Sequence, residues 1–293
     1  MVMEVIRSVI FVPGNRANML ERARSFDADI IMVDLEDSVP PGEKVTARDM
    51  AREWVPTLHA EGKRVMVRVN SLDTGLTRAE LETVVSPDLY GISLGKVESV
   101  RDIRTLDSLL NPLEAASELE IGSLRVIPWI ETAKAAWDAR AIAESSQRVV
   151  AIAFGAEDFT NDMGIERTDA GEEVAVPRAW VPVAARAGDV GALDSPFVRF
   201  QDPEALREDA GRARRMGYTG KFAIHPAQLE IINETFSPSD EEIEYARRVV
   251  DAWDAAEAGG RGSLALDGRM VDVPVVKRAQ NLLAFAEAIG KAS

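Results

Sequence analysis

The stretch RVIPWIETAKAAWDARAIAESSQRVVAIAF, residues 125–154, carries the clearest fold signal in the sequence. It opens with an apolar run over 125–130, continues with a polar segment of helical spacing over 134–144, and closes with a second apolar run over 149–154. Two short apolar runs on either side of an amphipathic segment predict two strands joined by a helix. Because a crossover helix returns the chain to its starting edge, the two strands are expected to pair in parallel.

The same alternation extends in both directions along the chain. Helical spacing also occurs over 16–25, 45–61 and 204–216. The eight expected strands cover residues 8–12, 30–34, 64–69, 91–94, 125–130, 149–154, 192–194 and 221–224. Eight strand–helix units over about 225 residues predict a TIM-like (β/α)8 barrel, for which ~250 residues is typical. An open doubly wound sheet is the alternative, but no G-x-G-x-x-G follows the first strand.

The C-terminal part of the chain breaks this alternation. We expect the barrel to cover 1–226 and a small C-terminal extension, a helical lid, to cover 227–293. Ser239 followed by Glu242 predicts the start of a helix. Asp267-Gly268 predicts a hairpin turn, after which a second helix is expected.

Composition excludes several classes of function. The 293 residues carry a net charge of −15, which argues against nucleic acid or an anionic membrane as a partner. The chain has no cysteine and only two histidines, so disulfides, thiolate catalysis and zinc sites built from Cys or several His are excluded. Any metal is therefore expected to be Mg²⁺ or Mn²⁺, held by carboxylates and water. No apolar stretch reaches the ~20 residues of a membrane span, and no signal segment is evident, so we expect a cytoplasmic protein.

Charged and polar residues gather directly after the expected strands. In a barrel these positions converge on one mouth, where barrel enzymes keep their active sites. The residues are Asp34, Glu36, Asp37, Arg68, Asn70, Lys96, Glu98, Glu131, Thr132, Glu157, Asp158, Asp194 and His225.

Two of these residues are the best metal ligands. Glu131 and Asp158 end neighbouring strands, so their carboxylates can meet and leave room for water and a chelating substrate. Arg68 can neutralise an oxyanion that develops beside the metal. Asp34 and Glu36 alternate along one extended segment and can hold the guanidinium in place. The alternative for Arg68 is a purely structural ion pair with those acids.

A competing motif predicts a serine hydrolase. Gly91-Ile-Ser93-Leu-Gly95 matches G-x-S-x-G, and Asp158 or Asp194 and then His225 follow in the order of a catalytic triad. However, a nucleophilic serine should stand in a tight turn after its strand, whereas Ser93 lies inside the apolar run. We therefore rank this hypothesis below the metal site.

Longer motifs resemble the citrate lyase beta-subunit-like family, which includes malyl-CoA and citramalyl-CoA lyases. The resemblance covers nearly the whole chain. One departure is Gly95-Lys96, where the family usually has Pro-Lys. The matching segments are Phe11-Val-Pro-Gly14, Val33-Asp-Leu-Glu-Asp-Ser-Val39, Arg68-Val-Asn70, Ile130-Glu-Thr132, Phe154-Gly-Ala-Glu-Asp158, Ala223-Ile-His-Pro-Ala-Gln228 and Gly268-Arg-Met-Val-Asp-Val-Pro274.

The resemblance implies a role for each site residue. Glu131 and Asp158 would bind Mg²⁺, and Arg68 would bind the oxygen of the oxo-acid. Asp272 would be the acid–base group and would reach the site from a neighbouring subunit. Arg16, just after the first strand, would contact the phosphates of coenzyme A. The family assembles as trimers or hexamers, so a homo-oligomer, such as a homotrimer, is expected.

The implied function is that of a Mg²⁺-dependent carbon–carbon lyase. It would cleave or form a β-hydroxyacyl-CoA thioester, giving an oxo-acid and an acyl-CoA by a Claisen-type mechanism. Malyl-CoA, citramalyl-CoA and citryl-CoA all stay open as substrates. The alternatives are a metal-dependent aldolase that acts on a free oxo-acid such as pyruvate, and an acyl-CoA thioesterase or hydrolase.

Overall fold

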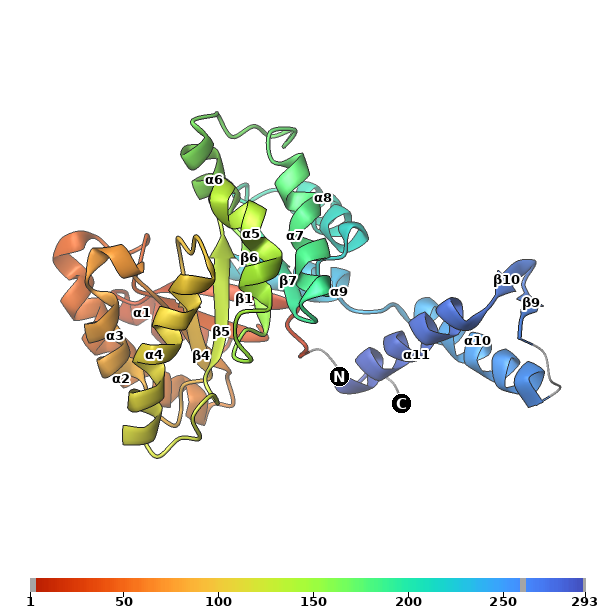
Figure 1. Ribbon diagram of the computed structural model, residues 1–293, viewed down its shortest axis with the longest axis horizontal. Helices are drawn as coiled ribbons and strands as arrows, with labels where there is room; N and C mark the ends of the chain where they lie inside the picture. Colours follow the sequence, from red (N-terminus) through yellow and green to blue (C-terminus); the bar gives the residue numbers. More distant parts are fainter. Residues whose placement is uncertain (1–3, 259–261, 292–293) are drawn as a thin grey trace. The chain divides into compact units, whose positions relative to one another are not determined.

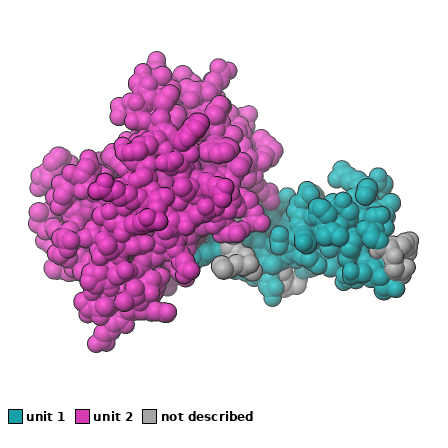
Figure 2. Space-filling view, viewed as in Figure 1, with its two compact units in different colours: residues 1–5, 234–293 teal, residues 6–233 magenta. Residues whose placement is uncertain are grey.

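The computed structural model describes residues 4–258 and 262–291 (Figure 1). The described residues form two compact units (Figure 2). The larger unit is formed by Ile6–Asn233, and the smaller one chiefly by the chain from Glu234 onward. The predicted division between residues 226 and 227 stays a prediction. No helix among the described residues is long and apolar enough to cross a membrane.

Eight parallel strands close into a barrel in the larger unit. Each strand pairs with the next along the chain, and β8 pairs back with β1. The strands are β1 (Ser8–Pro13), β2 (Ile30–Asp34), β3 (Val65–Val69), β4 (Gly91–Leu94), β5 (Arg125–Ile130), β6 (Ala151–Phe154), β7 (Gly191–Asp194) and β8 (Gly220–Ala223). All eight expected strands are present, which confirms the TIM-like barrel.

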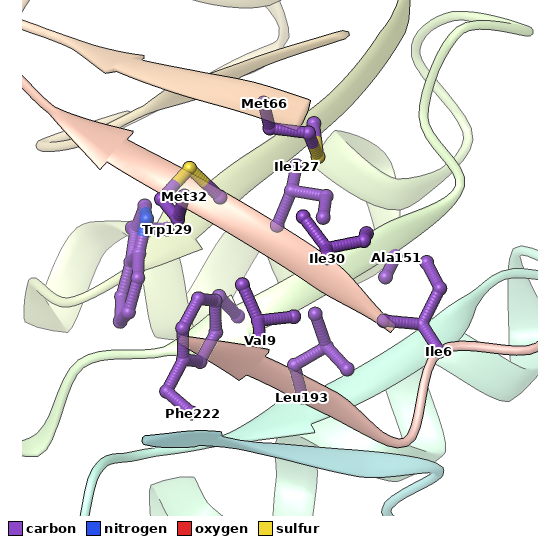
Figure 3. Packing of buried hydrophobic residues seen from close by; sticks show 11 residues of the cluster. Ile6, Val9, Ile30, Met32, Met66, Ile127, Trp129, Ala151, Leu193 and Phe222 are labelled. Carbon is purple, nitrogen blue, oxygen red and sulfur yellow. The ribbon is translucent and has the colours of Figure 1, made fainter. Parts of the chain in front are cut away.

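Alternate residues of the strands fill the interior of the barrel. Figure 3 shows the resulting cluster, in which every labelled side chain is apolar. The period of two explains the set, because successive side chains of a strand point to opposite faces. The cluster consists of Ile6, Val9, Ile30, Met32, Met66, Ile127, Trp129, Ala151, Ala153, Leu193 and Phe222.

Three aromatic rings lie together inside the barrel. The ring of Phe222 lies 5.2 Å from that of Phe11 and 4.5 Å from that of Trp129, measured between centroids. We call Phe11, Trp129 and Phe222 the aromatic layer. Packed rings of this kind form a rigid apolar surface that excludes water from whatever lies on it.

Helices surround the strands (Figure 1). The predicted helical segments correspond to α1, α2, α5 and α8, whereas α3, α4, α6, α7 and α9 were not specified from the sequence. The helices of the larger unit are α1 (Ala17–Ala23), α2 (Lys44–Ala60), α3 (Thr77–Val84), α4 (Val100–Ala116), α5 (Ala133–Ala143), α6 (Ala156–Met163), α7 (Ala175–Ala187), α8 (Pro203–Met216) and α9 (Leu229–Thr235). The last two residues of α9 belong to the smaller unit. Short 3₁₀ turns are η1 (Pro41–Glu43), η2 (Leu72–Thr74) and η3 (Pro226–Gln228).

The smaller unit contains a helix, a hairpin and a second helix. In chain order these are α10 (Asp240–Ala258), β9 (Leu264–Leu266), β10 (Arg269–Val271) and α11 (Val273–Ala288). The strands β9 and β10 are antiparallel and are joined by Asp267 and Gly268, both with positive φ. Two such residues in succession suit the tight turn of a hairpin. Trp253 and Val271 belong to a small apolar core between these elements.

Candidate active site

The alternation of the strands also brings charged side chains to the mouth of the barrel. Arg68 follows the core residue Met66 by two positions on β3, and Glu131 follows Trp129 by two positions at the end of β5. Each charged residue therefore points the same way as the core residue before it. At the C-terminal ends of the strands this direction leads to the mouth of the barrel.

Arg68 is fixed between the aromatic layer and an acid. Its guanidinium carbon lies 4.6 Å from the ring centroid of Phe11 and 5.9 Å from that of Trp129. Arg68 Nε donates a hydrogen bond of 2.7 Å to Asp34 Oδ1, and Arg68 Nη2 donates one of 2.7 Å to Asp34 Oδ2. Arg68 is buried, and Asp34 is fully buried. Two parallel hydrogen bonds and a stacked ring together fix the plane of the guanidinium.

Asp34 is held in its charged form. It accepts hydrogen bonds from the backbone N–H of Glu36 at 2.9 Å and of Ser38 at 3.1 Å. Burial alone would raise the pKa of Asp34, but the charge and hydrogen bonds of Arg68 outweigh it and lower that pKa. The buried ion pair considered for Arg68 is thus present. Because the pair lies at the mouth, it holds the guanidinium close enough to Glu131 and Asp158 for its charge to oppose the rise in their pKa values.

Glu131 and Asp158 lie near each other at the same mouth. Glu131 directly follows β5 and is buried. Asp158 is half-buried and lies in the first turn of α6, whereas the sequence placed it at the end of a strand. Burial, and then the negative charge of Asp158, raise the pKa of Glu131 to about 8. Burial and the charge of Asp37 also raise the pKa of Asp158. A bound cation would relieve this repulsion.

The donor set fits Mg²⁺. Both donors are carboxylates, the ligands that this hard cation prefers. Among the described residues, no group of three or more His, Asp and Glu side chains could hold a metal alone. Two carboxylates would leave the other positions to water and substrate, as Mg²⁺ commonly requires. Gly155 makes room for Glu131, because a Cβ there would lie 2.6 Å from Glu131 Oε2.

A cavity of about 460 Å³ opens beside these residues. Glu131 and Asp158 line it together with four further acids, Asp73, Glu98, Asp102 and Asp162. Lys96 is the only cationic side chain among the lining residues. An anionic substrate would meet a repulsive wall there unless a metal ion neutralised part of it.

Lys96 is a site residue for which we predicted no role. Its backbone N–H donates to Glu131 Oε1, and its ammonium pairs with Glu36 at 3.1 Å and Asp37 at 3.4 Å. The signals in the sequence were its place two residues after a strand and the Pro-Lys pair that the family usually has at Gly95-Lys96. The preceding Gly95 also has a structural reason, because a Cβ there would lie 2.8 Å from both carboxylate oxygens of Glu36.

The structure does not support a triad built on Ser93. The side chain of Ser93 is fully buried within β4, donates to the carbonyl of Ile127 and accepts from the indole of Trp129. Asp194 is buried in ion pairs with Arg178 and Lys221. His225 caps η3. The three residues therefore have separate structural roles, and the nucleophile-elbow hypothesis is wrong.

Asp272 and Arg16 are the two remaining predicted residues. Asp272, in the smaller unit, caps α11 by accepting a hydrogen bond of 3.4 Å from the backbone N–H of Val275. Arg16 is exposed directly after β1, in the larger unit. The structure thus brings together Asp34, Glu36, Arg68, Glu131 and Asp158, and the catalytic roles of all seven residues stay predictions.

A closed barrel with a buried arginine and two acids at its mouth has the architecture of a barrel enzyme, and its donor set fits a metal with oxygen ligands. Residues 7–226 match the family HpcH/HpaI aldolase/citrate lyase. The chain belongs to that family, which confirms the resemblance seen in the sequence.

Named relatives extend this result. The chain is 35% identical to the citrate lyase subunit beta of Leuconostoc mesenteroides over 96% of its own length and 93% of that protein. It is 35% identical to a (3S)-malyl-CoA thioesterase of Cereibacter sphaeroides, covering 97% and 95% of the two chains. The structure of CitE from Mycobacterium tuberculosis with magnesium, acetoacetate and coenzyme A has 29% identity and a TM-score of 0.77, over 96% of this chain and 97% of that one.

Replacement of Arg68 by lysine separates charge from geometry. Lysine keeps the positive charge but loses the planar fork that bonds both oxygens of Asp34. We expect Arg68→Lys to lose at least about 90% of turnover while the protein stays folded, since losing one transition-state contact costs roughly 10²-fold. Steady-state kinetics and circular dichroism would measure both. A lysine variant as active as the parent would mean that Arg68 is only a structural partner of the acids.

Proposed function

We propose that this protein is a Mg²⁺-dependent carbon–carbon lyase that cleaves or forms a β-hydroxyacyl-CoA thioester. The observation that carries the proposal is the oriented Arg68 guanidinium at the same mouth as the Glu131–Asp158 pair. The family match and the citrate lyase relative support the lyase chemistry. The neighbouring CitE structure, with magnesium, acetoacetate and coenzyme A, supports the choice of metal and substrate class.

The residues divide the chemistry between them. Glu131 and Asp158 would hold the Mg²⁺, whose contribution when bound is to polarise the oxygen of the oxo-acid half. Arg68 donates to that oxygen and offsets the charge that develops on it. In the direction of synthesis, Asp272 removes a proton from the carbon next to the thioester carbonyl, and this carbon then attacks the carbonyl of the oxo-acid. The alkoxide formed by that attack takes a proton from solvent. In cleavage the hydroxyl gives its proton to solvent, the same bond breaks, and protonated Asp272 returns a proton to the carbon next to the thioester carbonyl.

Purified protein incubated with malyl-CoA, citramalyl-CoA or citryl-CoA and Mg²⁺ tests this function. We expect an oxo-acid and an acyl-CoA to form in equal amounts from at least one of the three. Chromatography of the CoA species, with a coupled assay for the oxo-acid, would measure both products. No cleavage of any of these thioesters would overturn the proposal.

A thioesterase is the second candidate, because the Cereibacter sphaeroides relative carries that name. With Ser93 buried, hydrolysis would need a water molecule activated by the same carboxylates. The two outcomes differ in their products, because a lyase releases an acyl-CoA and a thioesterase releases free coenzyme A. A thiol-reactive dye added to the assay therefore distinguishes them.

The assembly and location are part of the same proposal. We expect a cytoplasmic homo-oligomer, a trimer or hexamer, in which Asp272 of one subunit serves the barrel of another. Arg16 is expected to contact the phosphates of coenzyme A, because it is an exposed cation in the loop from β1 to α1, and such loops lie at the mouth of a barrel.

A further inference from the structure

Arg68 and Lys96 are linked by two carboxylates. The Glu36 carboxylate forms an ion pair with each of them: Oε2 lies 3.2 Å from Arg68 Nη1, and Oε1 lies 3.1 Å from Lys96 Nζ. The Asp37 carboxylate does the same: Oδ2 lies 3.3 Å from Arg68 Nη1, and Oδ1 lies 3.4 Å from Lys96 Nζ. The four side chains thus form a closed ring of alternating charge, which we call the charge ring.

The backbone of Lys96 connects the charge ring to the metal pair. Lys96 has a φ of 52°, a left-handed conformation that residues other than glycine rarely adopt. In this conformation its N–H donates to Glu131 Oε1. Strained backbone of this kind persists where the surroundings impose it, often at functional sites. The same residue therefore contacts Glu131 with its backbone and the two acids of the ring with its side chain.

The ammonium also balances the charge around Arg68. Without Lys96, three carboxylates, those of Asp34, Glu36 and Asp37, would face the single positive charge of Arg68. Two of these acids are buried, so their charges are poorly screened by solvent. The surplus negative charge would oppose any negative charge that develops on a substrate oxygen beside Arg68.

We propose that Lys96 is a positioning residue for the reaction, which keeps the charge of Arg68 available to the substrate oxygen and aims Glu131 at the metal. This inference rests on the proposed function for the identity of the substrate oxygen. Two separate groups of Lys96, its side-chain ammonium and its backbone N–H, have different roles. The ammonium acts on Arg68 through Glu36 and Asp37, and the N–H acts on Glu131.

Lys96→Met separates these two parts, because methionine keeps the N–H and lacks the charge. Pyruvate, a simple oxo-acid, serves as the probe for the oxo-acid half of the substrate. At saturating Mg²⁺, we expect turnover to fall by at least about tenfold and the affinity for pyruvate to fall by a similar factor. Mg²⁺ binding is expected to stay unchanged or become tighter, because a positive charge beside the acidic cavity is removed. Isothermal titration with Mg²⁺ alone, and then with pyruvate, measures both affinities. A general disturbance of the site would instead weaken Mg²⁺ binding as well.

Two further variants sharpen the test. Lys96→Arg keeps the charge and should retain more turnover and pyruvate affinity than Lys96→Met. Lys134→Met is the matched control, since Lys134 pairs at 2.8 Å with Glu98, another acid of the cavity wall, and makes no ion pair with the charge ring within the described residues. We expect this control to stay within about twofold of the parent, as for a surface ion pair.

Three results would overturn the inference: parental turnover and pyruvate affinity in Lys96→Met, Mg²⁺ affinity that falls in parallel with turnover, or equal losses in Lys134→Met. If the parent cleaves no thioester, the proposed function fails by itself. The Mg²⁺ and pyruvate titrations then still decide the role of Lys96.

Discussion

Glu131→Ala and Asp158→Ala are each expected to lower turnover by at least about 10³-fold, because each removes one of the two protein ligands of the metal. Mg²⁺ binding, measured by isothermal titration, should become undetectable in both variants. The parent protein should lose its activity in EDTA and regain it with Mg²⁺. Activity that survives EDTA in the parent would contradict the metal site.

The control for this prediction is an acid of the same cavity wall that lies outside the metal pair. Glu98→Gln removes a half-exposed carboxylate that pairs with Lys134. Its Mg²⁺ affinity is expected to stay within a few-fold of the parent, as for other exposed charges. Equal losses in Glu98→Gln and Glu131→Ala would mean that the cavity attracts cations only through its overall charge.

The raised pKa of Glu131 gives the metal site a defined pH dependence. In the metal-free protein this pKa is about 8, so Glu131 carries a proton at neutral pH and must release it when Mg²⁺ binds. The apparent Mg²⁺ affinity should therefore rise roughly tenfold per pH unit up to pH ~8 and then level off. Without metal, the free energy of unfolding should fall as pH rises from about 4.5 to 8, because the folded protein holds this proton more tightly. In the Glu131→Gln variant, this fall in the free energy of unfolding between pH ~4.5 and ~8 should be absent.

Asp272→Asn is expected to reduce turnover by about 10²-fold or more, because it removes a proton-transfer group. Asparagine caps a helix about as well as aspartate, so α11 and the fold should be preserved. Melting temperature and Mg²⁺ affinity should match those of the parent. Near-parental turnover would mean that Asp272 serves only as the helix cap seen in the structure.

A mixing experiment tests whether Asp272 acts on another subunit. Neither Asp272→Asn nor Arg68→Ala is expected to show more than a small residual activity alone. If the site is shared between subunits, mixed oligomers contain some sites with both residues intact, and part of the activity returns. Subunit exchange must be verified separately, for example by mass spectrometry of labelled chains. An inactive mixture after verified exchange would argue that Asp272 acts within its own chain.

Much of the fold and part of the site followed from the sequence, because both depend on local periodicity. The eight apolar runs and their spacing predicted the barrel. Arg68 and Glu131 could be placed at its mouth, since the end of a strand is visible in the sequence. Asp158 was placed less accurately, because helix α6 begins two residues before it and no local signal separated strand end from helix start. The Ser93 motif was misleading, because the burial of a hydroxyl inside a strand depends on neighbours from other strands.

By itself, then, the sequence determined the barrel, the acidic mouth and the absence of cysteine chemistry, which are properties of composition and period. Which of these charges meet depends on contacts between distant segments, and these contacts exist only in the folded chain. Lys96 lies 60 positions from Glu36 along the chain, and their contact exists because the parallel pairing of β2 with β3 and of β3 with β4 places the ends of these strands side by side. The left-handed backbone of Lys96 and the space that Gly95 leaves for the Glu36 carboxylate are likewise set by these neighbours. Contacts between distant segments depend on the packed geometry of the closed barrel, and no local pattern encodes them.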